Sequence, residues 1–199
     1  NAASGINFDL TCGFNGRNPL HAKFLLQYVK EAKPVVVIAA PPCTGFKGWA
    51  SLNRINSPDT FATTLENSTA LAELTAAVAA EQMQNGRHFL VENPQGSALF
   101  QLPCWQKFVP HVTRVCFHQC QTGLRMKSPP FWPVKKPTEF WASHPALVKR
   151  VVNRICQNKH QHAHIGSTDG SVVTVKSKET QVWPEQLCGL IAAGVQEVL

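Results

Sequence analysis

The sequence predicts an α/β fold, with a parallel sheet that is covered by helices on both faces. Apolar runs of strand length at Val35–Ala39 and His88–Val91 each follow a segment with helical spacing. The helix expected between them, Thr63–Asn85, is rich in Ala, Leu and Glu and contains neither Gly nor Pro. Strands that alternate with helices in this way are typical of a doubly wound parallel sheet.

The elements at the start of the chain complete this alternation. Phe8–Thr11 is predicted as a short strand that ends in a polar turn. Pro19–Glu31 places its apolar residues near one helical face, and the following Lys33-Pro34 ends the helix. The expected order for residues 1–110 is therefore β-α-β-α-β. The connection Pro41–Thr60 is predicted as a loop, and loops of this length in compact domains are often functional.

Residues 111–199 are expected to complete the sheet of the same single domain, with an irregular and basic surface. The chain of 199 residues is long enough for one domain with a substantial core. The further elements expected are a short helix at Gln101–Phe108, strands at Val112–Gln119 and Thr138–Ala142, and helices at Pro145–Ile155 and Pro184–Val198.

The charge of the chain favours an acidic partner. It carries 19 Lys and Arg against 12 Asp and Glu, which gives a net charge of +7. Basic residues interleave with aromatic ones in the second half, as on surfaces that bind phosphates and bases. The candidate contacts there are Arg125, Lys127, Lys135 and Lys136, around Phe131 and Trp132. Lys47 and Arg54 in the long loop are further candidates, with DNA as the first expected partner and RNA as the second.

The sequence gives no sign of a membrane segment or of secretion. No apolar run approaches the length of a membrane span, so we expect no membrane association. The seven cysteines are an odd number, and no signal peptide precedes them. We therefore expect reduced thiols in an intracellular compartment, which for a DNA partner is the nucleus.

A thiol and a carboxylate follow the two predicted strands. Pro41-Pro42-Cys43 comes after Val35–Ala39, and Glu92-Asn93 comes after His88–Val91. The carboxyl ends of neighbouring parallel strands meet at one edge of a sheet, where such folds bind their ligands. A Cys nucleophile beside an acid is a pair suited to covalent catalysis. The alternative is that Cys43 is a buried structural thiol.

These two motifs resemble those of the cytosine-5 DNA methyltransferases. The sequence is also similar to methyltransferase-like domains embedded in copia-like retroelement polyproteins of dinoflagellates. That similarity is strongest in residues 86–94 and 136–138 and extends from roughly Phe8 to the C-terminus. It implies a Rossmann-like, methyltransferase-like sheet.

The resemblance also implies roles for individual residues. Cys43 would attack C6 of cytosine, Glu92 would hold the N3 edge of the ring, and Arg125 would be an auxiliary contact. The methyl donor would be S-adenosylmethionine, bound beside Asp9 and Pro41. An alternative for Asp9 is that it caps the turn that follows it.

The chain departs from the family in ways that leave two alternatives open. The family's first cofactor-binding strand and Gly-rich loop are absent, and Lys47 and Pro94 replace a Ser and a Val of the family motifs. The segment after Glu92 is also too short for a separate target-recognition domain. Either the cofactor segment lies upstream in a longer chain, since this one begins with Asn1, or the chain is a catalytically inactive nucleic-acid-binding module of a retroelement polyprotein.

Cysteines and histidines form a second candidate site, for zinc. The ligands considered are Cys156, His160, His162 and His164, together with the alternating Cys116, His118 and Cys120. Alternation on a strand would place each set on one face, and two such faces could supply the four ligands of a tetrahedral zinc ion. Neither set has the paired Cys-x2-Cys spacing of ordinary zinc modules. The alternative is that the thiols face the core and the histidines lie on a solvated basic loop.

Overall fold

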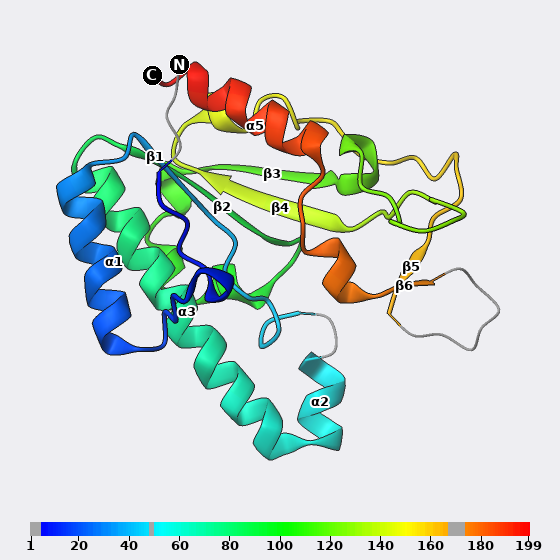
Figure 1. Ribbon diagram of the computed structural model, residues 1–199, viewed down its shortest axis with the longest axis horizontal. Helices are drawn as coiled ribbons and strands as arrows, with labels where there is room; N and C mark the ends of the chain where they lie inside the picture. Colours follow the sequence, from blue (N-terminus) through cyan, green and yellow to red (C-terminus); the bar gives the residue numbers. More distant parts are fainter. Residues whose placement is uncertain (1–4, 48–49, 167–173) are drawn as a thin grey trace.

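The computed structural model describes residues 5–47, 50–166 and 174–199 and centres on a four-stranded sheet (Figure 1). The strand order is β1 (Val36–Ala39), β2 (His88–Pro94), β4 (Pro137–Ala142) and β3 (Thr113–His118). β1 and β2 are parallel, whereas β4 is antiparallel to both of its neighbours. β1, β2 and β3 therefore run in one direction, with β4 inserted against them. The predicted α/β class is confirmed, but the sheet is mixed rather than parallel throughout.

Helices cover both faces of this sheet, as predicted. α1 (Pro19–Ala32) and α3 (Pro58–Gln84) lie on one side, and α5 (Glu185–Gln196) crosses the other (Figure 1). The side chain of Asn18 caps α1 by accepting the N–H of Leu20 at 2.9 Å. Each of the three helices lies within about six residues of the boundaries expected from its apolar spacing.

The alternation of side chains along β2 divides the core into two layers. Phe89 and Val91 belong to the cluster that faces α3, which also contains Trp105. Leu90, between them, points the other way and packs in the cluster that contains Leu187 of α5. Both faces of β2 are therefore buried, which explains the nearly continuous apolar run in its sequence.

Two of the predicted elements are wrong. Phe8–Thr11 is not a strand, because Asp9 accepts the N–H of Thr11 at 2.8 Å and caps a 3-10 turn at Leu10–Cys12. The helix expected at Pro145–Ile155 is a single 3-10 turn at Pro145–Leu147 followed by further turns, and Asn153 has a left-handed φ of 64°. In that segment the apolar side chains reach the core without a continuous helix.

The predicted loop Pro41–Thr60 contains a helix of its own, α2 (Ala50–Asn56), and α3 begins at Pro58.

β2 continues to Pro94, past the predicted end at Val91, because Glu92, Asn93 and Pro94 pair with β4. The expected helix at Gln101–Phe108 is interrupted at Leu102, which is extended and precedes the helical residues Pro103–Gln106. The remaining short elements are 3-10 turns at Ala98–Gln101, Val109–His111, Gln119–Thr122 and Ser177–Thr180, helix α4 at Pro103–Gln106, and strands β5 (His164–Ile165) and β6 (Thr174–Val175).

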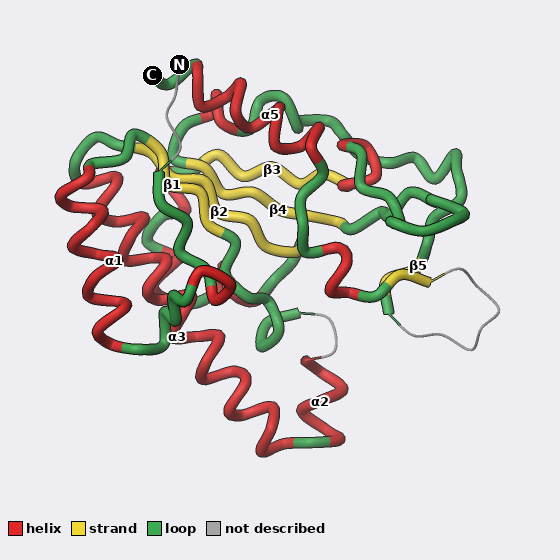
Figure 2. The backbone as a smooth tube through the Cα atoms, viewed as in Figure 1, coloured by secondary structure: helices red, strands yellow, loops and turns green. Residues whose placement is uncertain are grey.

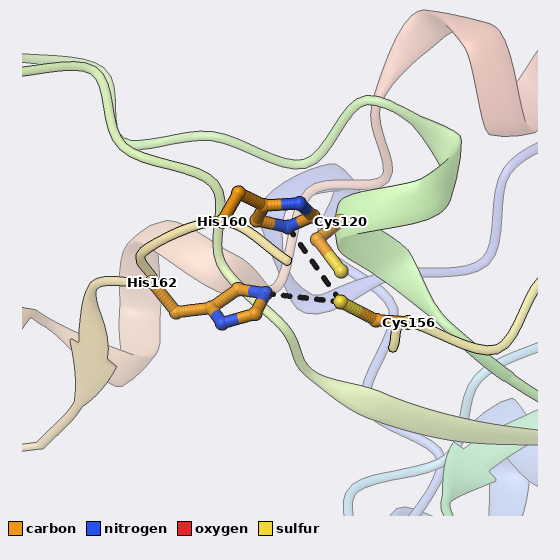
Figure 3. Close-up of side chains that lie close together, drawn as sticks. All are labelled: Cys120, Cys156, His160 and His162. Carbon is orange, nitrogen blue, oxygen red and sulfur yellow. Dashed lines mark hydrogen bonds between the residues drawn. The ribbon is translucent and has the colours of Figure 1, made fainter. Parts of the chain in front are cut away.

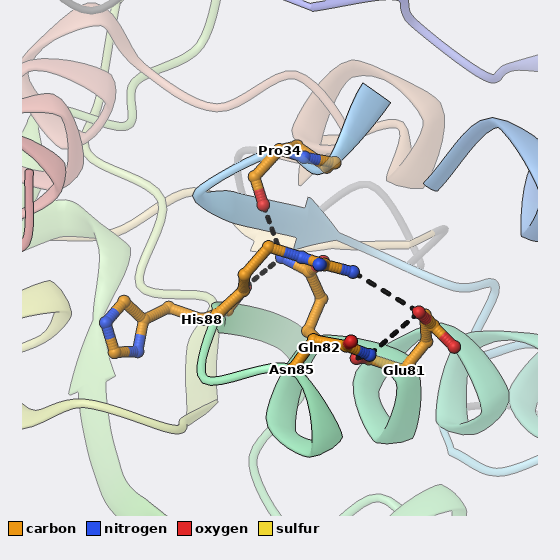
Figure 4. A network of polar contacts seen from close by, with 6 residues as sticks. Pro34, Glu81, Gln82, Asn85 and His88 are labelled. Carbon is orange, nitrogen blue, oxygen red and sulfur yellow. Dashed lines mark hydrogen bonds and ion pairs between the residues drawn. The ribbon is translucent and has the colours of Figure 1, made fainter. Parts of the chain in front are cut away.

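A buried glutamine joins the end of α3 to the beginnings of both parallel strands (Figure 4). Gln82 is fully buried, and its side-chain amide donates to the carbonyls of Pro34 and His88, each at 2.8 Å. Its Oε1 accepts a hydrogen bond from Nε of Arg87 at 2.8 Å, and Arg87 also pairs with Glu81. These bonds fix the register of the strands relative to the helix at the end opposite to the two motifs.

A small hydrophobic cluster lies within residues 124–175, apart from the two layers that flank the sheet. Leu124, Val134, Ala163 and Val175 form this third cluster. The parallel pair β5–β6, seen apart from the main sheet in Figure 2, lies beside it. In residues 5–47, 50–166 and 174–199, no helix combines the length and the apolar character that crossing a bilayer requires.

Candidate functional site

The two sequence motifs meet at the carboxyl ends of β1 and β2. Ala39 pairs with Val91, so the segments that carry Cys43 and Glu92 leave the paired region at the same edge of the sheet. The side-chain amide of Asn93 donates to the carbonyl of Pro41 at 2.9 Å. The structure thus brings the Pro-Pro-Cys and Glu-Asn motifs together, in the position where open α/β sheets bind ligands.

The loop that carries Cys43 is held against α3. The N–H of Lys47 donates to the carbonyl of Cys43 at 3.0 Å, which closes a turn. Inside this turn, the N–H of Gly45 donates to Oγ of Ser68 at 3.2 Å. A Cβ atom at Gly45 would lie 2.9 Å from that oxygen and 3.0 Å from Cα of Leu65, so only glycine allows this approach. The position of the thiol is therefore coupled to α3.

Glu92 is a buried carboxylate with a single cation beside it. Only 7% of its side chain is exposed, and Nζ of Lys136 lies 3.5 Å from Oε1. This contact lacks the geometry of a hydrogen bond, and among the described residues Oε1 has no hydrogen-bond partner. Burial raises the pKa of Glu92, because desolvation outweighs the attraction of Lys136. The carboxyl group therefore holds its proton to a higher pH than an exposed glutamate does.

Lys136 belongs to this site, although its sequence position suggested a phosphate contact. Only 16% of its side chain is exposed, and Nζ donates to the carbonyl of Thr180 at 3.1 Å as well as pairing with Glu92. The lysine reaches the carboxylate because it immediately precedes β4, in which Phe140 pairs with Glu92. No local sequence signal marks that pairing, so Lys136 could not be assigned to Glu92 from the sequence.

Cys43 is electrostatically coupled to both of these groups. Burial raises the pKa of the Cys43 thiol, and the negative charge of Glu92 raises it further. The positive charge of Lys136 acts in the opposite direction. Two acidic groups whose pKa values are both raised tend to retain a proton between them. Lys136 then balances the one negative charge that is left.

Nothing in the described residues supports S-adenosylmethionine binding beside Asp9 and Pro41. Asp9 is exposed and caps its own turn, and the hydrogen bonds from Thr11 lower the pKa of its carboxyl group. An open depression nearby is lined by aromatic residues that include Phe8 and Phe14, and Asp9 is not part of its lining. Pro41 is buried, and its carbonyl accepts a hydrogen bond from the side-chain amide of Asn93. Oδ1 of Asp9 already accepts from Thr11 and the carbonyl of Pro41 accepts from Asn93, so these contacts give no support for a cofactor site.

The predicted nucleic-acid contacts divide between exposed and engaged side chains. Lys47, Arg54 and Lys127 are exposed. Arg125 is exposed too, and its guanidinium donates to the carbonyl of Phe131 at 3.4 Å. The described contacts do not bring Arg125 to Cys43 or Glu92. Lys135, by contrast, is half-buried and donates to Oδ1 of Asn158 at 3.0 Å.

Four cysteine and histidine side chains form a compact cluster that could hold a metal ion (Figure 3). They are Cys120, Cys156, His160 and His162, and their potential ligand atoms all lie within 4.8 Å of one another. Sγ of Cys156 lies 3.6 Å from Nε2 of His160 and 3.4 Å from Nε2 of His162. His164, which the sequence also suggested, is exposed in β5 and lies outside this cluster.

The expected ligand face on β3 is not formed, because the strand ends at His118. Cys120 lies in the 3-10 turn Gln119–Thr122 and no longer shares a face with Cys116, which lies beside Glu139. Nδ1 of His118 instead accepts the N–H of Cys156 at 2.9 Å and supports the loop. In the absence of a metal, burial and the neighbouring Cys156 raise the pKa of Cys120 to about 11.

Comparisons of this chain with protein-family models, with curated proteins and with solved structures found no match. An assignment of function therefore depends on the chemistry of the Cys43–Glu92–Lys136 group, of the exposed basic surface and of the cysteine–histidine cluster.

Proposed function

We propose that this chain is a cytosine-5 methyltransferase-like domain that binds a cytosine base of nucleic acid between Cys43 and Glu92. The observation that supports it best is the coupled group formed by Cys43, Glu92 and Lys136 at the carboxyl ends of β1 and β2. The proposal implies a Rossmann-like sheet in which β4 is an inserted antiparallel strand. Mixed sheets are common among α/β folds, although their antiparallel strand is usually at an edge, whereas β4 lies between β2 and β3.

The proposed chemistry is a reversible covalent addition to the base. The Cys43 thiolate forms a bond to C6 of the ring, the C5–C6 double bond is broken, and electron density moves toward N3. The carboxyl group of Glu92 donates its proton to N3, so that the adduct is neutral at that position. Reversal of these steps expels the thiolate and returns the proton to Glu92.

The raised pKa of Glu92 favours the proton that this step needs on the carboxyl group, whereas the raised pKa of Cys43 opposes its thiolate. The reactive form needs a thiolate at Cys43 and a proton on Glu92, and both can be supplied by moving one proton from the thiol to the carboxylate. Lys136 carries a positive charge beside the pair in either form. The transfer leaves the net charge of the three groups unchanged, so it does not create an unpaired buried charge.

The proposal assigns the methyl-transfer step to no residue of the described chain. S-adenosylmethionine is the donor that the family resemblance implies, but the contacts of Asp9 and Pro41 give no support for a site for it. The cysteine–histidine cluster has no role in the addition to the base. What the described residues supply to the proposal is the pair of groups, Cys43 and Glu92, that would act on the base.

The proposed partner is nucleic acid, with DNA in the nucleus as the first candidate and RNA as the second. A base has to leave its stack to reach a buried thiol. The exposed hairpin around Arg125, Lys127 and Phe131 could contact the surrounding backbone and bases, because 52% of the Phe131 side chain is exposed among these cations. Contacts of this kind give an affinity that falls steeply with salt.

Hydrogen exchange at C5 of cytosine tests the addition without a methyl donor. While Cys43 is bonded to C6, C5 of the enamine takes up a solvent deuteron, and loss of its original proton followed by expulsion of the thiolate leaves deuterated cytosine. An oligonucleotide incubated with the protein in deuterium oxide would gain mass, read by mass spectrometry. Cys43→Ala and Glu92→Gln should abolish the exchange. Cys104→Ala, at another half-buried thiol, should retain it.

The same experiment separates this proposal from an inactive binding module, which the raised pKa of Cys43 favours because a protonated thiol is a poor nucleophile. Exchange that depends on Cys43 and Glu92 supports the enzyme-like site. Salt-dependent binding of the oligonucleotide without exchange supports the inactive module. A chain that neither exchanges nor binds would exclude both.

A further inference from the structure

We propose that Cys120, Cys156, His160 and His162 bind one structural zinc ion. Two thiolates and two imidazoles are a complete ligand set for zinc, which is four-coordinate and tetrahedral in structural sites. With two thiolate charges the bound ion is electrically neutral overall, so it can be held in a half-buried position. The site lies in the C-terminal part and does not depend on the function proposed for Cys43 and Glu92.

The two distances from Cys156 to the histidines match those of a tetrahedral site. Zn–S bonds of about 2.3 Å and Zn–N bonds of about 2.0–2.1 Å place neighbouring sulfur and nitrogen ligands about 3.5 Å apart. Sγ of Cys156 lies 3.4 Å and 3.6 Å from Nε2 of the two histidines. Both rings therefore present the same nitrogen to one centre, and Nδ1 of each is left to carry the ring proton.

The surroundings of Cys156 suit a thiolate rather than a thiol. Its Sγ accepts a hydrogen bond from the N–H of Asn158 at 3.3 Å, and its own N–H donates to Nδ1 of His118. Cys156 is also buried, which would disfavour an unpaired thiolate but suits one bound to a metal. The backbone around this ligand is therefore fixed before a metal arrives.

The site lies where the fold has few other means of stabilisation. Its ligands come from the 3-10 turn after β3 and from the loop between Cys156 and His162, which hydrogen bonds hold to the hairpin at Pro133. Among the described residues, the hydrophobic cluster beneath these ligands has four buried members, Leu124, Val134, Ala163 and Val175. Small units with little core commonly depend on a metal or on disulfides. The seven cysteines are all free, so a metal is the cross-link available among the described residues.

Metal analysis of protein purified under reducing conditions tests the proposal. We expect about one zinc ion per chain. Cobalt added to the metal-free protein should give the intense visible absorption of a tetrahedral ion and a near-ultraviolet band from thiolate ligation, and zinc should displace it. Wild-type protein that retains no zinc and gives only the weak spectrum of six-coordinate cobalt would overturn the proposal. A Cys120–Cys156 disulfide in freshly purified, metal-free protein would also overturn it.

Two matched pairs of variants identify the ligands. His162→Gln should weaken zinc binding strongly, whereas His164→Gln, two positions along at an exposed residue, should not. Loss of a supporting hydrogen bond typically costs about 10- to 100-fold in metal affinity, so loss of a direct ligand should cost more. Cys156→Ser should lose the cobalt–thiolate band, and Cys188→Ser, at an exposed thiol, should keep it. Equal loss in both members of either pair would contradict the assignment.

Discussion

The side-chain amide of Asn93 donates a hydrogen bond to the backbone carbonyl of Pro41 at 2.9 Å, across 52 positions of sequence. Asn93 is completely buried, and its Oδ1 has no hydrogen-bond partner among the described residues. One amide therefore ties the loop that carries Cys43 to the strand that carries Glu92. Its loss would leave the carbonyl of Pro41 without this partner.

Asn93→Ala is expected to destabilise the fold by about 1–3 kcal/mol, the usual cost of leaving a buried polar group unpaired. Urea unfolding followed by tryptophan fluorescence would measure this change. Asn85→Ala is the matched control, because that amide is exposed and bonds to the carbonyl of Glu81 in its own helix. If both variants lose the same free energy of unfolding, the Asn93–Pro41 hydrogen bond stabilises the fold no more than an exposed one does.

The raised pKa of Glu92 predicts how stability changes with pH. Its carboxyl group is protonated more readily in the fold than in the unfolded chain, so the native state binds the extra proton. The contribution of Glu92 to stability is therefore fully present below the ordinary pKa of 4.5 and is lost as pH rises through the raised value.

Glu92→Gln isolates this effect, because glutamine has the shape of the protonated acid but does not titrate. The free energy of unfolding of the wild type, relative to this variant, should fall as pH rises from below the ordinary pKa of 4.5 through the raised pKa. Urea unfolding of both proteins across that range is the measurement. A difference that stays constant with pH would mean that Glu92 titrates as it does in the unfolded chain.

The reactivity of Cys43 should respond in opposite directions to its two charged neighbours. Iodoacetamide reacts with the thiolate, so a higher pKa gives slower alkylation at neutral pH. Glu92→Gln should lower the pKa of Cys43 and speed its alkylation, whereas Lys136→Met should raise the pKa and slow it. Peptide mass spectrometry gives the rates, with exposed Cys188 as the internal reference. If both variants accelerate Cys43, loosening of the fold rather than charge is the cause.

Two glycines of α5 should give opposite results when replaced by alanine. A Cβ atom at Gly194 would lie 2.6 Å from the carbonyl oxygen of Ala146 and 2.9 Å from Cα of Leu147, whereas one at Gly189 meets nothing within 4 Å. Gly194→Ala is expected to destabilise the protein by about 1–3 kcal/mol through overpacking. Gly189→Ala should stabilise it by about 0.5–1 kcal/mol through helix propensity. Urea unfolding measures both, and changes of the same sign would contradict the close packing of α5.

Removal of the metal should loosen one part of the molecule and leave the rest intact. The N–H of Ala163 donates to the carbonyl of Pro133 at 2.9 Å, and the N–H of His118 donates to that of Arg154 at 3.0 Å. Both amides should exchange faster with deuterium after chelation, because the ligand loop is then no longer cross-linked. The amide of Phe89, in the main sheet, should keep its protection. Unchanged exchange at Ala163 would show that zinc does not stabilise this loop.

The secondary structure was predictable where local patterns decide it. α3 and the parallel strands β1 and β2 followed from composition and apolar runs alone. The failure at Phe8–Thr11 has a local cause as well, since the side chain of Asp9 competes for the backbone of Thr11. The antiparallel place of β4 could not be predicted, because it depends on pairing between segments far apart in the chain.

The residues of the two candidate sites were also predictable only where local sequence patterns place them. Cys43 and Glu92 follow the predicted strands Val35–Ala39 and His88–Val91, and this alone predicts that they meet. Lys136 lies beside Glu92 because it immediately precedes β4, which pairs with β2. This contact therefore depends on a strand order that the sequence does not show. Cys120 joins the metal cluster only because the chain turns at Gln119, which a period-two pattern does not anticipate.

The insertion of β4 between β2 and β3 has a consequence for the order of folding. β3 comes before β4 in the chain but pairs only with β4, so the sheet cannot be assembled strand by strand in sequence order. β3 and β4 are closer together in the chain than β2 and β4 are, so docking of β4 on β2 closes the longer loop and is expected to be slower. That docking is also what carries Lys136 to Glu92. Lys136 can therefore stand beside Glu92 only once β4 is paired with β2, and a nascent chain that has not yet formed β4 lacks the cation that balances Cys43 and Glu92.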